Sequence, residues 1–106
     1  MIVRELLETV DAIKENQIPD SLKFRWINDV EGRVHCEIKR QSPESFKAIV
    51  SEDEALTVPE PYASLYTLFL VSMIEFAQGN YSDFARLTVE FEKNLEIYAK
   101  WYIRSL

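Results

Sequence analysis

The sequence predicts an all-α domain of four helices, with an antiparallel C-terminal helical hairpin and one long central loop. The 106 residues include only two glycines and four prolines, too few for the frequent turns of an all-β fold. Apolar residues recur at intervals of three and four over long segments, which is the spacing of a helix face. The length allows one domain, residues 1–106, with one hydrophobic core.

The first part of the chain predicts two helices, at about residues 2–15 and 21–40. The first is indicated by an apolar row at Val3, Leu6, Leu7, Val10 and Ile13. Pro19 separates the two helices because a proline disfavours the helical conformation of the residue before it. Asp20 or Ser21 is expected to cap the second helix. Its apolar row is Leu22, Trp26, Val30, Val34 and Ile38, with Ile27 beside it, and Ser42-Pro43 follows its end.

Residues 42–60 predict a long loop because the regular apolar spacing is lost there. Residues 46–50 are compatible with a short strand or with an apolar tether. The run from Thr57 to Pro61 is expected to be extended, because each proline restricts the residue before it. Long loops in compact domains are often functional. The loop therefore supplies candidate partner contacts at Glu52, Asp53, Glu54, Pro59 and Pro61.

Two further helices are predicted at about residues 62–78 and 81–104, joined by a tight turn at Gly79-Asn80. The third helix is apolar on nearly every side, and Glu75 is its only charge. Such a helix is either wrapped by the other elements or partly covered by another protein chain. Near the end of the fourth helix, aromatic side chains can contact a partner. The candidates are Trp101 and Tyr102 in the fourth helix, together with Tyr62, which opens the third helix.

The net charge of −6 is concentrated in residues 48–99, which hold nine acids and two bases. This distribution repels phosphate backbones and disfavours nucleic acid as a primary partner, but it suits docking onto a basic protein surface or simple solubility. The longest uncharged apolar run, residues 63–74, is too short to cross a bilayer. A single cysteine cannot form an internal disulfide, which favours a reducing cytoplasm.

Catalytic and metal-binding patterns are not found. His35 and Cys36 are adjacent on a helix and point about 100° apart, so they are poorly placed to chelate one metal. Glu52–Glu54 lacks the spacing of a calcium loop, and two glycines cannot form a phosphate-binding loop. We therefore expect no enzyme activity, metal or cofactor. A small-molecule-binding bundle would require a polar pocket inside it, with Glu75 as the residue to inspect.

Two resemblances extend this interpretation. The turn at residues 76–85 is similar to that between the two helices of a tetratricopeptide repeat, which suggests an alternative role as a helical adaptor for a cellular protein.

The wider resemblance follows from the order of several blocks. They are residues 3–5 and 10–16, residues 22–34, the acidic stretch before residues 56–62, Leu65-Tyr66, residues 73–81, Phe91 and residues 98–102. In this order the chain resembles a family encoded in the structural gene clusters of tailed phages and prophages of Gram-positive bacteria, described as head–tail connector or adaptor-like.

That resemblance implies a virion assembly protein without enzymatic activity. Its partners would be the portal, other head–tail connector proteins and further copies of itself in a homo-oligomer. It would be made in the host bacterial cytoplasm and reside in the virion after assembly.

Overall fold

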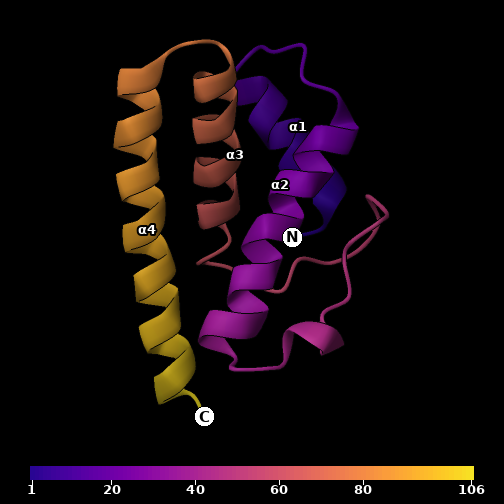
Figure 1. Ribbon diagram of the computed structural model, residues 1–106, viewed down its shortest axis with the longest axis vertical. Helices are drawn as coiled ribbons and strands as arrows, with labels where there is room; N and C mark the ends of the chain where they lie inside the picture. The colour runs from indigo at the N-terminus through magenta and orange to yellow at the C-terminus, as the bar shows by residue number, and fades with distance from the viewer.

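The computed structural model describes residues 1–106, and the predicted all-α fold is confirmed (Figure 1). It contains four α-helices and no strands. A five-residue π-helix, Val34–Ile38, continues the second helix, and a single 3₁₀ turn, Pro43–Ser45, lies in the central segment. The helices are α1 (Val3–Ile13), α2 (Asp20–Arg33), α3 (Ser64–Ala77) and α4 (Tyr81–Arg104).

The hairpin of α3 and α4 is the most extensive helix pairing in the molecule. Gly79 has a φ of 83°, in the left-handed region that glycine tolerates best. The Gly79 and Asn80 amides donate to the carbonyls of Phe76 (3.0 Å) and Glu75 (2.8 Å), which closes the end of α3. The chain then reverses directly into α4, whose bounds are those predicted from its amphipathic spacing.

The neighbouring helices bury most of α3. Besides α4, it contacts α1 and α2, so three elements surround it. The first predicted alternative, wrapping by the rest of the domain, therefore accounts for most of its apolar surface. Its last turn is the exception, because Phe76 is 50% exposed.

The prediction for the second helix is wrong in the later part of the helix and in the residue that caps its start. Regular α-helix ends at Arg33, and a π-helix follows in which the Lys39 amide donates to the Val34 carbonyl (2.9 Å). Arg40 then takes a left-handed φ of 57° and stops the helix before residue 40 is included. At the other end, Pro19 occupies the cap position and no side chain caps the helix, so neither Asp20 nor Ser21 has the predicted role.

The predicted extended run into the third helix is also corrected. The Glu60-Pro61 peptide bond is cis, and the Tyr62 amide donates to the Pro59 carbonyl (2.9 Å). The chain therefore turns over residues 59–63, and α3 begins at Ser64 rather than at residue 62. In the preceding loop no strand forms. Ile49 anchors the segment in the core, whereas Val50 is 83% exposed.

Two charged residues of α2 lie inside the molecule. Lys23 and Glu31 are spaced four residues on either side of Ile27, which is fully buried. The three residues therefore form a second row on the buried face, next to the predicted apolar row. Lys23 donates to Asp11 of α1 (Nζ to Oδ1, 2.7 Å), and Glu31 accepts hydrogen bonds from the central segment and from α3.

Candidate interaction surfaces

The carboxyl group of Glu31 holds the central segment against the helices. One of its oxygens accepts the amide (3.0 Å) and hydroxyl (2.8 Å) of Thr57, and the other accepts the hydroxyl of Tyr66. The Tyr66 hydroxyl in turn accepts the amide of Val58 (2.9 Å). Burial, with Glu31 nearby, raises the pKa of Tyr66 far above its ordinary value, so its hydroxyl stays a donor. We call Glu31, Thr57, Val58 and Tyr66 the Glu31 latch.

A second attachment lies earlier in the segment. The side-chain amide of Asn28 donates to the Ile49 carbonyl (3.0 Å), and its oxygen accepts the Ile49 amide (2.7 Å). Asn28 thus satisfies both backbone groups of one residue, as a neighbouring strand would. Together with the Glu31 latch, it fixes both ends of residues 49–58 to the surface of α2.

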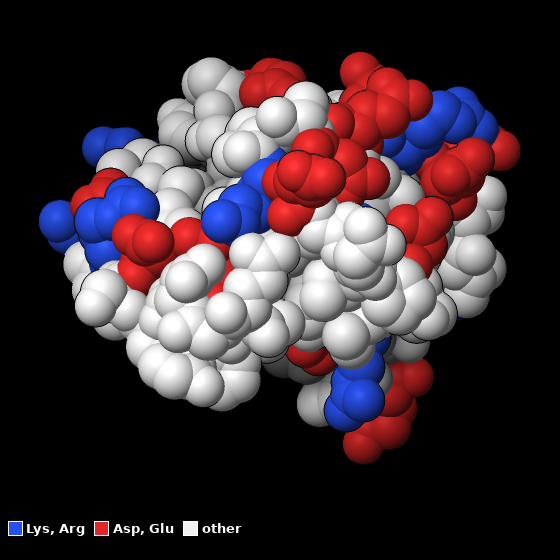
Figure 2. All heavy atoms as spheres, turned by 90° about the horizontal axis from the view of Figure 1, so that it is seen from above, with Lys and Arg blue, Asp and Glu red and all other residues white.

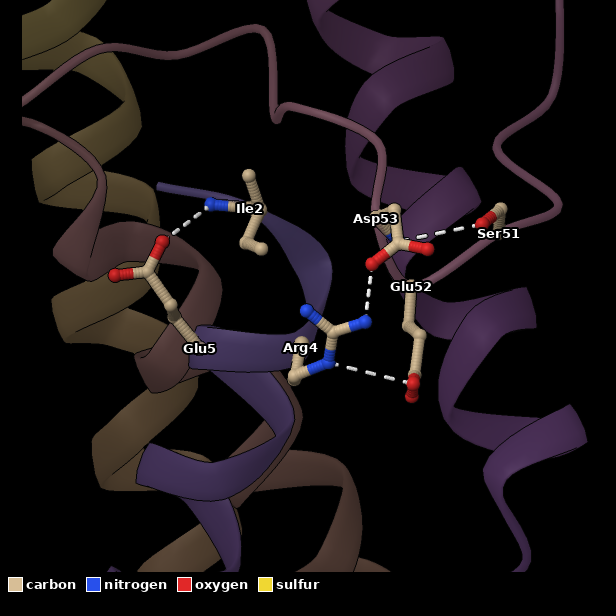
Figure 3. Close-up of polar contacts among 6 residues, drawn as sticks. All are labelled: Ile2, Arg4, Glu5, Ser51, Glu52 and Asp53. Atoms are coloured by element: carbon tan, nitrogen blue, oxygen red, sulfur yellow. Dashed lines mark hydrogen bonds and ion pairs between the residues drawn. The ribbon is translucent and has the colours of Figure 1, made fainter.

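The predicted acidic contacts Glu52, Asp53 and Glu54 lie at the first turn of α1. The carbonyls of Glu54 and Glu52 accept the amides of Val3 (3.0 Å) and Arg4 (2.9 Å), two of the donors that a helix start leaves free. The Arg4 side chain pairs with Glu52 (3.4 Å) and Asp53, as Figure 3 shows. The pKa of the Arg4 guanidinium is raised, mainly by its hydrogen bond to Asp53.

The acidic run therefore has an intramolecular role. Negative groups at a helix start complement the positive end of its dipole, and the run supplies backbone acceptors there as well. The Glu54 carboxyl turns inward and accepts the amides of Val50 (2.8 Å) and Ser51 (2.7 Å). Glu52 and Asp53 keep side chains that are 51% and 69% exposed, so both remain accessible to a partner.

The other predicted contacts form a separate aromatic group. Tyr62 lies against Trp101 (ring centroids 5.3 Å apart) and Tyr98 (5.9 Å), and Tyr102 is 6.2 Å from Tyr98. Tyr62, Trp101 and Tyr102 are half-buried, and burial raises the pKa of Tyr98. These rings fasten the turn before α3 to the last turns of α4. Pro59 and Pro61 are exposed beside this group.

A more exposed aromatic cluster lies at the α3–α4 turn. The ring of Phe76 is 5.5 Å from that of Tyr81 and 5.0 Å from that of Phe84. Phe76 and Tyr81 are 50% and 63% exposed, and Phe84 is half-buried beneath them. We call these three residues the aromatic cap. Figure 2 looks onto this end of the molecule and shows a broad uncharged area, with charged side chains at its edges.

No protein-family model, curated protein or solved structure matches this chain.

His35 and Cys36, the residues considered for chemistry, have separate surroundings. The His35 Nε2 lies 2.9 Å from the Ser42 carbonyl oxygen and 2.9 Å from the Ser45 hydroxyl, and its ring meets Phe46 edge-on (5.5 Å). Cys36 is a half-buried free thiol. No group of three or more His, Cys, Asp or Glu side chains is arranged to hold a metal ion. None of the helices has both the length and the apolar character needed to cross a lipid bilayer.

Glu75 does not lie in a polar pocket of the bundle. Its side chain is 8% exposed and pairs with Lys14, the residue that follows α1 (2.9 Å), and it also accepts a hydrogen bond from Asn80 (3.4 Å). A polar hollow of about 320 Å³ lies instead beside the central segment, where Glu31, His35 and Glu54 contribute to its lining.

The aromatic cap is not among the contacts predicted from the sequence, which include none of Phe76, Tyr81 and Phe84. Two sequence signals point toward it: the third helix is apolar on nearly every side up to its last turn, and these aromatics flank the turn that follows.

Proposed function

We propose that this chain is a virion assembly protein, a head–tail connector-type subunit that associates with copies of itself and docks on a portal protein, without catalysis. The observation that carries the proposal is the aromatic cap. Half or more of the surface of Phe76 and of Tyr81 faces solvent, side by side, at one end of the molecule. Exposed apolar patches with polar edges mark protein contact sites, and aromatic residues are enriched in such contacts.

The order of sequence blocks, which resembles that of the connector family, supports the phage setting. The exposed carboxylates of Glu52 and Asp53 lie on the side of the molecule that carries α1, and they supply a second, polar contact region. Because their pairs with Arg4 are on the surface, these pairs contribute little stability, and exchanging them for a partner's basic groups costs little.

Sedimentation velocity over a range of protein concentrations, with and without a portal protein from a tailed phage of a Gram-positive bacterium, tests the proposal. The wild-type chain should associate with itself or with the portal. Phe76→Ala combined with Tyr81→Ala should weaken that association about tenfold or more, because two buried aromatic contacts would be lost.

A matched control is Ile97→Ala combined with Ile103→Ala, which removes apolar side chains that are 54% and 64% exposed elsewhere on α4. It should leave association unchanged. A chain that stays monomeric at every concentration and does not bind the portal contradicts the proposal.

A further inference from the structure

An open groove of about 480 Å³ runs between α4 and the segment formed by α2 and the π-helix. Its least exposed lining residues, Ile38 and Leu95, are 9% and 7% exposed and form an apolar floor. Val89 stands on the α4 side and is 53% exposed. None of the three residues of the aromatic cap lines the groove, so its properties are independent of the role proposed above.

The length of the groove suits a helix. Its α4 wall extends from Thr88 to Ala99. At about 1.5 Å per residue, this wall is roughly 17 Å long, or about three helical turns. An amphipathic helix that binds in a groove uses apolar side chains at positions i, i+3 or i+4, and i+7, which span about 10 Å. Val89 and Leu95 lie within this length.

Carboxylates stand on both sides of the apolar floor. Glu37 lines the π-helix side, and Glu92 and Glu96 line the α4 side. The basic residue Arg33 is already engaged, because it donates to both oxygens of Glu92 (2.7 and 3.2 Å) and to Glu37 (2.9 Å). The Glu92 hydrogen bond is the main reason that the pKa of Arg33 is raised.

The remaining charges of the groove leave a carboxylate available to an incoming basic side chain. Lys93 pairs with Glu90, which lies outside the groove lining (3.6 Å). Glu96 pairs with Lys100 at 3.2 Å, but both side chains are 67% exposed. Exposed pairs of this kind contribute little, so the Glu96 carboxylate can accept an incoming base at low cost. The groove thus combines an apolar floor with edges on which three carboxylates outnumber the two bases, Arg33 and Lys93.

We propose that this groove binds a basic amphipathic helix of a partner protein. The apolar stripe of that helix packs on Ile38, Leu95 and Val89. Its flanking lysine or arginine side chains pair with Glu96 and with Oε1 of Glu37, since Arg33 donates to the other Glu37 oxygen, Oε2. The acidic edges discriminate against a helix with acidic flanks, because like charges would then face each other across the contact.

Fluorescence anisotropy with synthetic peptides tests this proposal. The probe is a labelled peptide of about 18 residues, long enough to form a helix, with leucine on one face and lysine on the other. Two further peptides keep the same spacing: one replaces every lysine by glutamate, and the other replaces every leucine by serine. The leucine/lysine peptide should bind in the micromolar range, and the other two should bind at least about tenfold more weakly.

Two matched pairs of variants locate the binding site. Val89→Asp should weaken peptide binding about tenfold, whereas Ile97→Asp, at a residue of nearly equal exposure outside the groove lining, should change it by less than about twofold. Glu96→Lys should also weaken binding more than Asp83→Lys, which reverses a charge on the same helix at a residue that neither lines the groove nor pairs with a lining residue.

Several results would overturn the proposal. They are equal binding of the three peptides, no binding of the leucine/lysine peptide, and equal effects within either variant pair. A fourth is nuclear magnetic resonance shifts of the groove amides that follow protein concentration without any peptide, since these would assign the groove to a second copy of the chain.

Discussion

Replacing Tyr66 by phenylalanine should cost about 3 kcal/mol of unfolding free energy, although the ring stays fully apolar and fits the same space. The hydroxyl has two partners in the Glu31 latch: it donates to the Glu31 carboxyl and accepts the amide of Val58. A hydrogen bond to a charged group contributes about 1.5–3 kcal/mol, and a buried amide left without an acceptor costs about 1–3 kcal/mol. Because Val58 is fully buried, water cannot replace the lost acceptor.

Urea unfolding followed by tryptophan fluorescence measures this effect, with Trp26 buried and Trp101 half-buried as reporters. The midpoint should fall without a change in the slope of free energy against urea concentration. In thermal unfolding, about 3 kcal/mol corresponds to roughly 15 °C for a domain of this size.

Tyr98→Phe is the matched control. Tyr98 is 1% exposed, but no protein group hydrogen-bonds its hydroxyl, so this change should cost less than about 0.5 kcal/mol. Thr57→Val should cost about 1 kcal/mol, because the Thr57 amide still donates to Glu31. Equal effects of Tyr66→Phe and Tyr98→Phe would refute the role assigned to the Glu31 latch.

Two other predictions concern single positions. Gly32→Ala should stabilise the protein by about 0.5–1 kcal/mol, because Gly32 lies in a helix and an added Cβ would meet nothing within 4 Å. Gly79→Ala should destabilise it by about 1–2 kcal/mol, because the φ of 83° at this position is unfavourable for alanine. Urea unfolding that ranks the two variants the other way contradicts this. The Lys23 hydrogen bond lowers the pKa of Asp11 below 3.8, so the pair stabilises the fold above that pH and loses its effect as the pH falls through the lower folded-state pKa. The stability gap between wild type and Asp11→Asn should therefore shrink below about pH 4, and a gap of constant size down to about pH 2 would be evidence against this coupling.

The helices could be predicted because their signals are local. Apolar spacing defines α1 and α4, and Gly79 marks the hairpin turn through its own backbone freedom. The π-helix was not predictable in the same way. Its apolar residues Val34 and Ile38 keep a spacing of four, and the stop at Arg40 uses a conformation that arginine seldom adopts.

The surfaces depend on partners distant in sequence. Lys23 and Glu31 are charged residues whose burial is possible only because Asp11, Thr57 and Tyr66 reach them. The acidic run suggests a docking site from its composition alone, but part of its role is to complete α1. Phe76 has the same local pattern as the buried residues of α3, and its exposure depends on how far the neighbouring helices extend.

The start of α1 has a consequence for the motions of the protein. With eleven residues, α1 is shorter than the roughly 12–15 residues at which an isolated helix becomes marginally stable. Its first amides are bonded to carbonyls about fifty residues away, and the Leu56 amide is bonded to the Met1 carbonyl (2.9 Å). The hydrogen bonds of the Val3, Arg4 and Leu56 amides should therefore open together, so that the three amides exchange their hydrogens as one unit. This unit should form late in folding, because it joins distant parts of the chain.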